Sequence, residues 1–104
     1  GANILCAPAA FTKVTGEAHW HILQRARAIE TGSSIISPAL RGSHSEGKET
    51  YGHSLIIDPW GRVLADGGEG PGVISAKIDM NKVNEVRAKI PSLQHDKIFN
   101  VETV

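Results

Sequence analysis

Short apolar runs separated by turn residues dominate the pattern along the chain. Residues 4–7 form the first such run, which stops at Pro8 and predicts a buried strand. Four further runs have the length and the flanking turn residues of strands. They cover residues 33–37, 53–58, 62–66 and 73–78. The chain is therefore expected to build a sheet of several short strands.

Two stretches instead follow the helical period. Residues 16–31 predict a helix that has Thr15 at its N-cap and ends at Gly32. A second helix is predicted between Asp79, its N-cap, and Pro91, which cannot continue a helix. Its inward-facing positions are expected to be Val83, Val86 and Ile90. The order strand, helix, four strands and helix predicts the α/β class, with helices on a face of the sheet.

The first helix carries two kinds of surface. Most of its apolar positions share one arc when plotted at about 100° per residue, and this arc is expected to lie on the sheet. The arc consists of Ala18, Ile22, Leu23, Ala26 and Ile29. Because His19 and Glu30 fall inside the arc, we expect a partly buried histidine and an ion pair of Glu30 with an Arg or Lys. Trp20, Leu23 and Arg27 stand on the flank of the arc, which predicts contact with a partner.

Turn residues separate the later strands. Residues 58–61, "DPWG", have Asp first, Pro second and Gly fourth, as in a type I turn followed by a left-handed residue. This turn predicts a hairpin between residues 53–58 and 62–66. Residues 67–72, "GGEGPG", predict a second turn. The polar stretch at residues 39–51 predicts a long loop of the kind that often carries function.

Composition limits the function classes. With 104 residues, 40% of them apolar and 21% charged, the chain is an ordinary globular domain. Its 11 basic and 11 acidic side chains are scattered, so no basic stripe is available for a nucleic acid or an anionic membrane. No run reaches the roughly 18 apolar residues of a membrane-spanning helix. A single cysteine indicates a reducing compartment, and we expect a cytoplasmic protein.

The stretch "TGEAHWH" at residues 15–21 concentrates groups that could bind a metal. His19 and His21 are two positions apart, and on a helix such side chains point about 200° away from each other. Ligand pairs on a helix need a spacing of three or four residues. We therefore predict no metal site.

The candidate nucleophiles are equally weak. Cys6 lies inside the first predicted strand, where a free cysteine usually packs as a small apolar residue, so we expect it in the core. His53 and Ser54 are neighbours on a strand and point to opposite faces, which excludes a catalytic pair. Residues 46–50 and 67–72 lack the spacing of a phosphate-binding loop. Local chemistry thus indicates no complete active site.

Three long stretches resemble one family. They are "GANILCAPAAFTKVTGEAHWHILQRARAIETG", "YGHSLIIDPWGRVLADGGEGPG" and "AKIDMNKVNEVRAKIPSL". Together they are similar to the C-terminal portion of the nitrilase, or carbon–nitrogen hydrolase, superfamily, in the branches acting on deaminated glutathione and on ω-amides. The chain also opens on Gly1 without a methionine and enters a predicted strand at once. We therefore expect residues 1–104 to be the C-terminal part of one such domain.

The resemblance implies a four-layer αββα sandwich, of which this chain would form half, with a mixed sheet and helices on one face. It also implies amide hydrolysis by a cysteine thiolate, helped by a glutamate base and a lysine, without a cofactor. In the family these groups precede the segment that begins at Gly1. Cys6 occupies the strand after the nucleophile's helix and does not inherit that role. No residue of this chain is predicted to be catalytic.

What the resemblance assigns to this chain is the edge of a site. Phe11 and Thr12 match a loop beside the family's active-site mouth, and Ala39 and Leu40, preceded by Pro38, match another part of its rim. The stretch that follows, residues 41–51, would be a specificity loop. The small-molecule amide itself cannot be named from these residues.

Two functions remain open. The chain is either part of an amidase of small linear amides, inactive by itself, or a truncated homologue that works by association. The helix with Trp20, Leu23 and Arg27 matches one that pairs across a two-fold axis in family oligomers, so a homodimer or larger homo-oligomer is expected. An uncovered sheet face would also favour self-association. Its side chains would include Ile35, Leu55 and Ile57.

Overall fold

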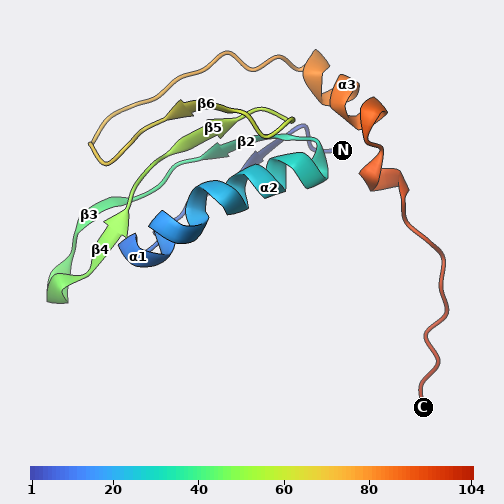
Figure 1. Ribbon diagram of the computed structural model, residues 1–104, viewed down its shortest axis with the longest axis horizontal. Helices are drawn as coiled ribbons and strands as arrows, with labels where there is room; N and C mark the ends of the chain where they lie inside the picture. The colour runs from blue at the N-terminus through green and yellow to red at the C-terminus, as the bar shows by residue number, and fades with distance from the viewer.

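A mixed four-stranded sheet forms the centre of the computed structural model, which describes residues 1–104. The strands lie in the order β1–β2–β5–β6 (Figure 1). They span Ile4–Cys6, Ser34–Ser37, Leu55–Ile57 and Val63–Asp66. β1 runs parallel to β2, whereas β5 and β6 continue the sheet antiparallel. The predicted α/β class with a mixed sheet is confirmed.

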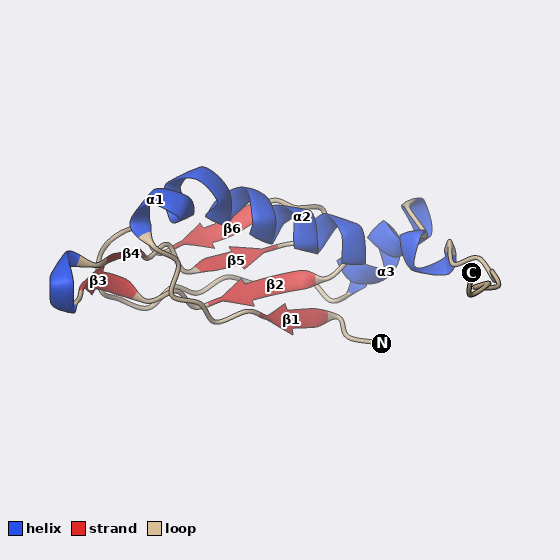
Figure 2. Cartoon of the chain, turned by 90° about the horizontal axis from the view of Figure 1, so that it is seen from below, coloured by secondary structure: helices blue, strands red, loops and turns tan.

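One continuous helical stretch covers one face of this sheet (Figure 2). It consists of α1 at Lys13–Thr15, a π-helical turn at Gly16–Trp20 and α2 at His21–Thr31. Gly32 ends it in the left-handed conformation, with φ 56°. The helix predicted at residues 16–31 is confirmed, but Thr15 is not its N-cap. Thr15 is itself helical, because the chain already turns into a helix at Lys13.

The core lies between this helix and the sheet. Its buried side chains are Trp20, Ala28, Ile35, Leu55 and Ile57. Ile35 pairs with Ile57 across β2 and β5, so both side chains face the helix. The three strand residues of this core were expected on an uncovered face. They are buried because the helix lies over them.

The helix presents a different side to the sheet from the one that its apolar arc predicts. Ile22 is 67% exposed and Ile29 is 46% exposed. Trp20 and Ala28 face the sheet instead, because the large indole fills the interior while the small Ala28 lets the helix lie close. The other members of the predicted arc, namely Ala18, His19, Leu23, Ala26 and Glu30, are exposed as well. Glu30 does form the expected ion pair, with Arg27 on the helix surface.

Cys6 is exposed, so its predicted place in the core is wrong. Leu5 packs against the core beneath the helix, and successive side chains of a strand point to opposite faces. Cys6 therefore points away from the helix, from a strand at the edge of the sheet.

The polar stretch at residues 39–51 is a small hairpin rather than a loop. β3 at Arg41–Ser43 pairs antiparallel with β4 at Glu49–Tyr51, around a short 3-10 turn at Ser45–Gly47. The pattern conceals these strands because their residues are mostly polar and the hairpin lies outside the main sheet. The bridge between Thr12 and Thr50 connects the hairpin to the start of the helix.

Residues 73–78 are extended but do not join the sheet, so the strand predicted there is wrong. Ile74, Ala76 and Ile78 are half-buried, whereas Val73 is 96% exposed. This alternation is that of a strand. The segment nevertheless makes no backbone hydrogen bond, because no strand of this chain lies beside it in register.

The last helix, α3 at Asn81–Lys89, follows this segment, and a 3-10 turn at Ser92–Gln94 follows the helix. The N-cap of α3 is Met80, one residue after the predicted Asp79, whose side chain still accepts a hydrogen bond from the N–H of Asn81 at 3.0 Å. The predicted inward positions are Val83, Val86 and Ile90. The two valines are buried, but Ile90 is 47% exposed because the helix ends before it. No helix is both long and apolar enough to cross a membrane.

The predicted hairpin between residues 53–58 and 62–66 is confirmed by the pairing of β5 with β6. Its turn is held by Asp58, whose Oδ1 accepts hydrogen bonds from the N–H groups of Trp60 and Arg62, both at 2.9 Å. Gly61 has φ 85°, the left-handed conformation that the turn requires. The hairpin fixes which residues of β6 lie opposite those of β5.

Candidate functional site

A cavity of about 490 Å³ opens at one end of the sheet. The end of β2, the start of β5, the end of β6 and the loop after β6 form its walls. Its polar side chains include Arg41, His53, Ser54 and Asp66. None of its 17 lining residues is a cysteine, a lysine or a glutamate. The polar side chains of the cavity are thus those of one arginine, one histidine, two serines and one aspartate.

The predicted rim residues divide into two groups. Ala39 lines the cavity, while Leu40, its exposed neighbour, does not. Phe11 packs in the interior with its ring centroid 5.2 Å from that of Trp20, and Thr12 hydrogen-bonds to Thr15 at 2.6 Å. Ala9 and Ala39 form a short parallel β-bridge. This bridge holds the segment that carries Phe11 beside the segment that carries Leu40. A role of these residues in substrate binding stays a prediction.

The predicted partner surface needs one correction. Trp20 is 1% exposed, so it cannot form part of an outer contact surface. Its ring belongs to the core, where its N–H group donates to a partly buried carbonyl, that of His53. Leu23 is 47% exposed and the side chain of Arg27 is 62% exposed. For these two residues the partner contact stays a prediction.

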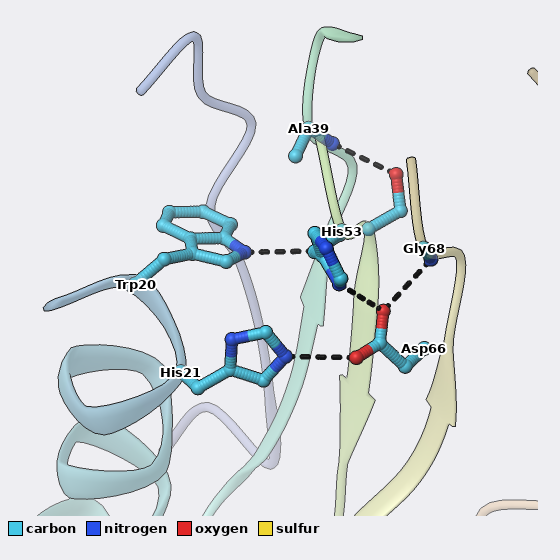
Figure 3. Close-up of polar contacts among 7 residues, drawn as sticks. Trp20, His21, Ala39, His53, Asp66 and Gly68 are labelled. Carbon is cyan, nitrogen blue, oxygen red and sulfur yellow. Dashed lines mark hydrogen bonds and ion pairs between the residues drawn. The ribbon is translucent and has the colours of Figure 1, made fainter. Parts of the chain in front are cut away.

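Beside the cavity, one carboxylate lies between two imidazoles (Figure 3). Nε2 of His21 lies 2.8 Å from Oδ2 of Asp66, and Nδ1 of His53 lies 2.8 Å from Oδ1. The three residues come from the first turn of α2, the bend before β5 and the end of β6. The carboxylate thus connects the helix to the sheet.

Contacts of its backbone and of its ring hold His53 in place. The indole N–H of Trp20 donates to its carbonyl oxygen at 2.8 Å, and its own N–H donates to the carbonyl of Gly68 at 2.9 Å. Its ring stacks on Tyr51 with centroids 4.3 Å apart. Its φ of 57° is unusual for a residue with a side chain. These contacts compensate for the strained backbone and fix the direction of the imidazole.

The electrostatics of this cluster favour an ionised carboxylate. Burial acts to raise the pKa of Asp66, but hydrogen bonds from His21, the Gly68 N–H and His53 hold it below the ordinary 3.8. Asp66 therefore accepts hydrogen bonds at neutral pH, and each imidazole directs an N–H toward it. Burial, followed by the negative charge of Asp66, raises the pKa of Tyr51. Tyr51 thus stays a neutral phenol.

Ser54 has a different role from its neighbour. Its hydroxyl oxygen accepts a hydrogen bond from the N–H of Ala39 at 2.9 Å. This contact joins the residue before β5 to the segment after β2, and no hydrogen bond connects Ser54 to the ring of His53. The two neighbours form no catalytic pair, as the sequence predicts.

The cluster of His21, His53 and Asp66 is not predicted from the sequence. On the helix His21 has only His19 as a neighbouring candidate ligand, whereas its partner Asp66 lies 45 positions later. One available signal is the predicted hairpin. Its register places Leu55 opposite Asp66, and this brings the end of β6 beside His53.

Comparison with known proteins identifies the family. A family model described as carbon-nitrogen hydrolase matches residues 1–88. The deaminated glutathione amidase of Synechocystis sp. (strain PCC 6803 / GT-S) is 52% identical over 95 residues, which make up 91% of this chain and 35% of that protein. The deaminated glutathione amidase of Homo sapiens is 48% identical over 95 residues, covering 91% of this chain and 29% of that protein.

The fold agrees with the sequence comparison. The crystal structure of Saccharomyces cerevisiae Nit3, a member of branch 10 of the nitrilase superfamily, matches with a TM-score of 0.82 and 32% identity. The match covers 90% of this chain and 35% of that one, so the chain spans about a third of such relatives. Its sheet and helices are part of a nitrilase-type fold. The chain belongs to the carbon-nitrogen hydrolase family.

Proposed function

We propose that this chain is the C-terminal part of an amidase that hydrolyses the carbon–nitrogen bond of small linear amides. The observation that carries the proposal is the 52% identity, over 91% of the chain, to a protein named deaminated glutathione amidase. Because the chain spans only about a third of that protein, the complete enzyme would need further residues.

The chemistry would depend on groups outside this chain. A cysteine thiolate attacks the amide carbon, ammonia leaves, and water hydrolyses the resulting thioester to a carboxylate and the free thiol. The cavity is lined by no cysteine, lysine or glutamate, and Cys6 is not among its lining residues. This composition supports the inference that residues 1–104 alone are inactive and contribute no catalytic residue.

The part of this chain in the reaction would be to bind the substrate. Arg41 is the only Arg or Lys side chain lining the cavity. A guanidinium group suits a carboxylate, because it can donate two parallel hydrogen bonds. We therefore assign to Arg41, and to the hairpin at residues 41–51, the recognition of a carboxylate on the amide substrate.

Ammonia release provides the test. The chain joined to the segment that precedes it in its relatives should hydrolyse deaminated glutathione, whereas residues 1–104 alone should not. Arg41→Ala in the longer protein should raise KM at least tenfold with a smaller change in kcat, while Cys6→Ala should change neither. Hydrolysis by residues 1–104 alone that is lost in Cys6→Ala would overturn the proposal.

The alternative is a non-catalytic module that associates with copies of itself. The observation favouring it is the exposed apolar side of α2, where Ile22, Leu23 and Ile29 are 67%, 47% and 46% exposed. A homo-oligomer is compatible with either function. The absence of ammonia release from the longer protein would favour the module. The single cysteine supports a cytoplasmic location for both, which cell fractionation can check.

A further inference from the structure

Three potential metal ligands converge beside the cavity. One ring nitrogen each of His21 and His53 and one carboxylate oxygen of Asp66 all lie within 4.8 Å of one another. They come from the helix, the bend before β5 and the end of β6, so only the folded chain assembles them (Figure 3). We propose that these three residues bind a divalent transition-metal cation such as Zn²⁺.

The donor set defines the class of cation. Two imidazole nitrogens and one carboxylate oxygen suit Zn²⁺ and its first-row neighbours, whereas Mg²⁺ and Ca²⁺ require mostly oxygen ligands. Three protein ligands leave a further position open for water. The nitrogen–oxygen distances of 2.8 Å mean that a small outward movement of the side chains makes room for the ion.

Neighbouring groups already orient two of the ligands. The ring of His53 stacks on Tyr51, and its backbone is held by Trp20 and Gly68. The N–H of Gly68 also donates to Oδ1 of Asp66 at 2.8 Å. Such supporting contacts preserve ligand geometry in metal sites, and here they are made by groups that are not ligands themselves.

Protons must move when the cation binds. In the metal-free protein each imidazole directs an N–H toward Asp66. A metal needs the lone pair of the same nitrogen, so each ring proton moves to the other nitrogen of the ring. Asp66, already ionised, exchanges two hydrogen bonds for one bond to the metal. The bound cation would fasten α2 to the end of the sheet.

The helical spacing that predicts no metal site applies to a different pair of histidines. His19 and His21 cannot share an ion, and His19 is not a member of the present cluster. This makes His19 the matched control, since it is an exposed histidine two positions before His21 on the same helical stretch.

Titration calorimetry of the full chain with Zn²⁺ and with Mg²⁺ tests the proposal. We expect one Zn²⁺ bound with a Kd of about 10 µM or tighter and no binding of Mg²⁺ in the same range. His21→Gln, His53→Asn and Asp66→Asn should each weaken Zn²⁺ binding at least tenfold. Asn is chosen at position 53 because it tolerates a positive φ. His19→Gln should bind as the unaltered chain does.

The proposal would be overturned if His19→Gln lost as much Zn²⁺ affinity as the three ligand variants, or if the unaltered chain bound no Zn²⁺ at 100 µM. Circular dichroism shows whether a metal-free variant still folds. A second measurement on the unaltered chain needs no variant. In NMR spectra Zn²⁺ should shift the imidazole signals of His21 and His53 together and leave those of His19, His44 and His95 in place. A Zn²⁺-induced shift of the signals of His19, His44 and His95 alone would also refute the site.

Discussion

Trp20 donates its indole N–H to the main-chain carbonyl of His53, 33 positions later in the chain, at 2.8 Å. The ring that makes this contact is 1% exposed and packs on Phe11. One side chain therefore fills the core and holds the bend that carries His53. This double role explains why the helix turns Trp20, and not Ile22 or Ile29, toward the sheet.

Replacing Trp20 should separate these two roles. Trp20→Phe keeps most of the ring but leaves the carbonyl of His53 without its donor, so we expect a loss of about 1–3 kcal/mol in the free energy of unfolding. Trp20→Ala also opens a cavity and should cost about 3–5 kcal/mol. Urea titration measures both. Trp60→Phe is the control, since Trp60 is 52% exposed and should change stability by less than about 0.5 kcal/mol. Equal effects of the two Phe variants would contradict this interpretation.

The pKa of Asp58 predicts a pH-dependent stability. Burial acts to raise this pKa, but the hydrogen bond from Lys82 at 2.5 Å, with those from Arg62 and Trp60, holds it below 3.8. A group whose pKa is lowered on folding stabilises the folded state above its unfolded pKa. That contribution disappears as the pH falls through the folded value.

Asp58→Asn should therefore cost about 1–3 kcal/mol at pH 7, and the difference from the unaltered chain should shrink as the pH falls below about 4. Urea titrations between pH 7 and pH 2 measure the difference. The control is Glu46→Gln, because Glu46 pairs with Lys48 in an exposed ion pair that contributes little. A pH-independent difference between Asp58→Asn and the unaltered chain would show that ionisation of Asp58 is not responsible.

Gly16 should resist a substitution that helices normally favour. A Cβ at this position would overlap the Cβ and the ring of Tyr51. Gly16→Ala should thus destabilise the chain by about 1–3 kcal/mol, although Ala is the better helix former by about 1 kcal/mol. Thermal unfolding checks the sign. Glu17→Ala, at the next and exposed position, should have little effect. A stabilised Gly16→Ala chain would mean that Tyr51 moves aside without cost.

The sequence predicts the parts of this fold that depend on neighbouring residues. The turn at residues 58–61 follows from Asp, Pro and Gly at fixed positions, and the end of the first helix follows from Gly32. Neighbouring residues do not determine which side of that helix faces the sheet, because apolar residues lie on more than one side of it. Only the fold shows that Trp20 and Ala28 point inward.

The same limit applies to the candidate site. Ala39 can be assigned to the cavity from the family resemblance, but His21 and Asp66 lie 45 positions apart and meet only when the correct side of the helix faces the sheet. The strand predicted at residues 73–78 is wrong for a related reason. Alternating burial describes the segment itself, whereas a strand also needs a hydrogen-bonded neighbour.

Arg87 attaches the last helix to the start of the chain. Its guanidinium group donates to the carbonyls of Ala2 and Thr31, to Oδ1 of Asn3 and to Oγ of Ser33. A lysine cannot reach these diverging acceptors, so Arg87→Lys should cost about 1–3 kcal/mol. Urea titration measures the loss, with the exposed Arg27→Lys as control. Equal effects of the two substitutions would show that the fork-shaped contact is unimportant.

Leu23 tests whether the exposed side of α2 binds a second copy of the chain. Its side chain is 47% exposed, so Leu23→Lys should leave the free energy of unfolding of the monomer nearly unchanged while placing a charge in an apolar interface. We expect self-association, measured by sedimentation equilibrium, to weaken at least tenfold. Leu40→Lys changes another exposed leucine, 54% exposed and outside the helix, and should leave self-association intact. If both variants associate like the unaltered chain, α2 does not form the interface.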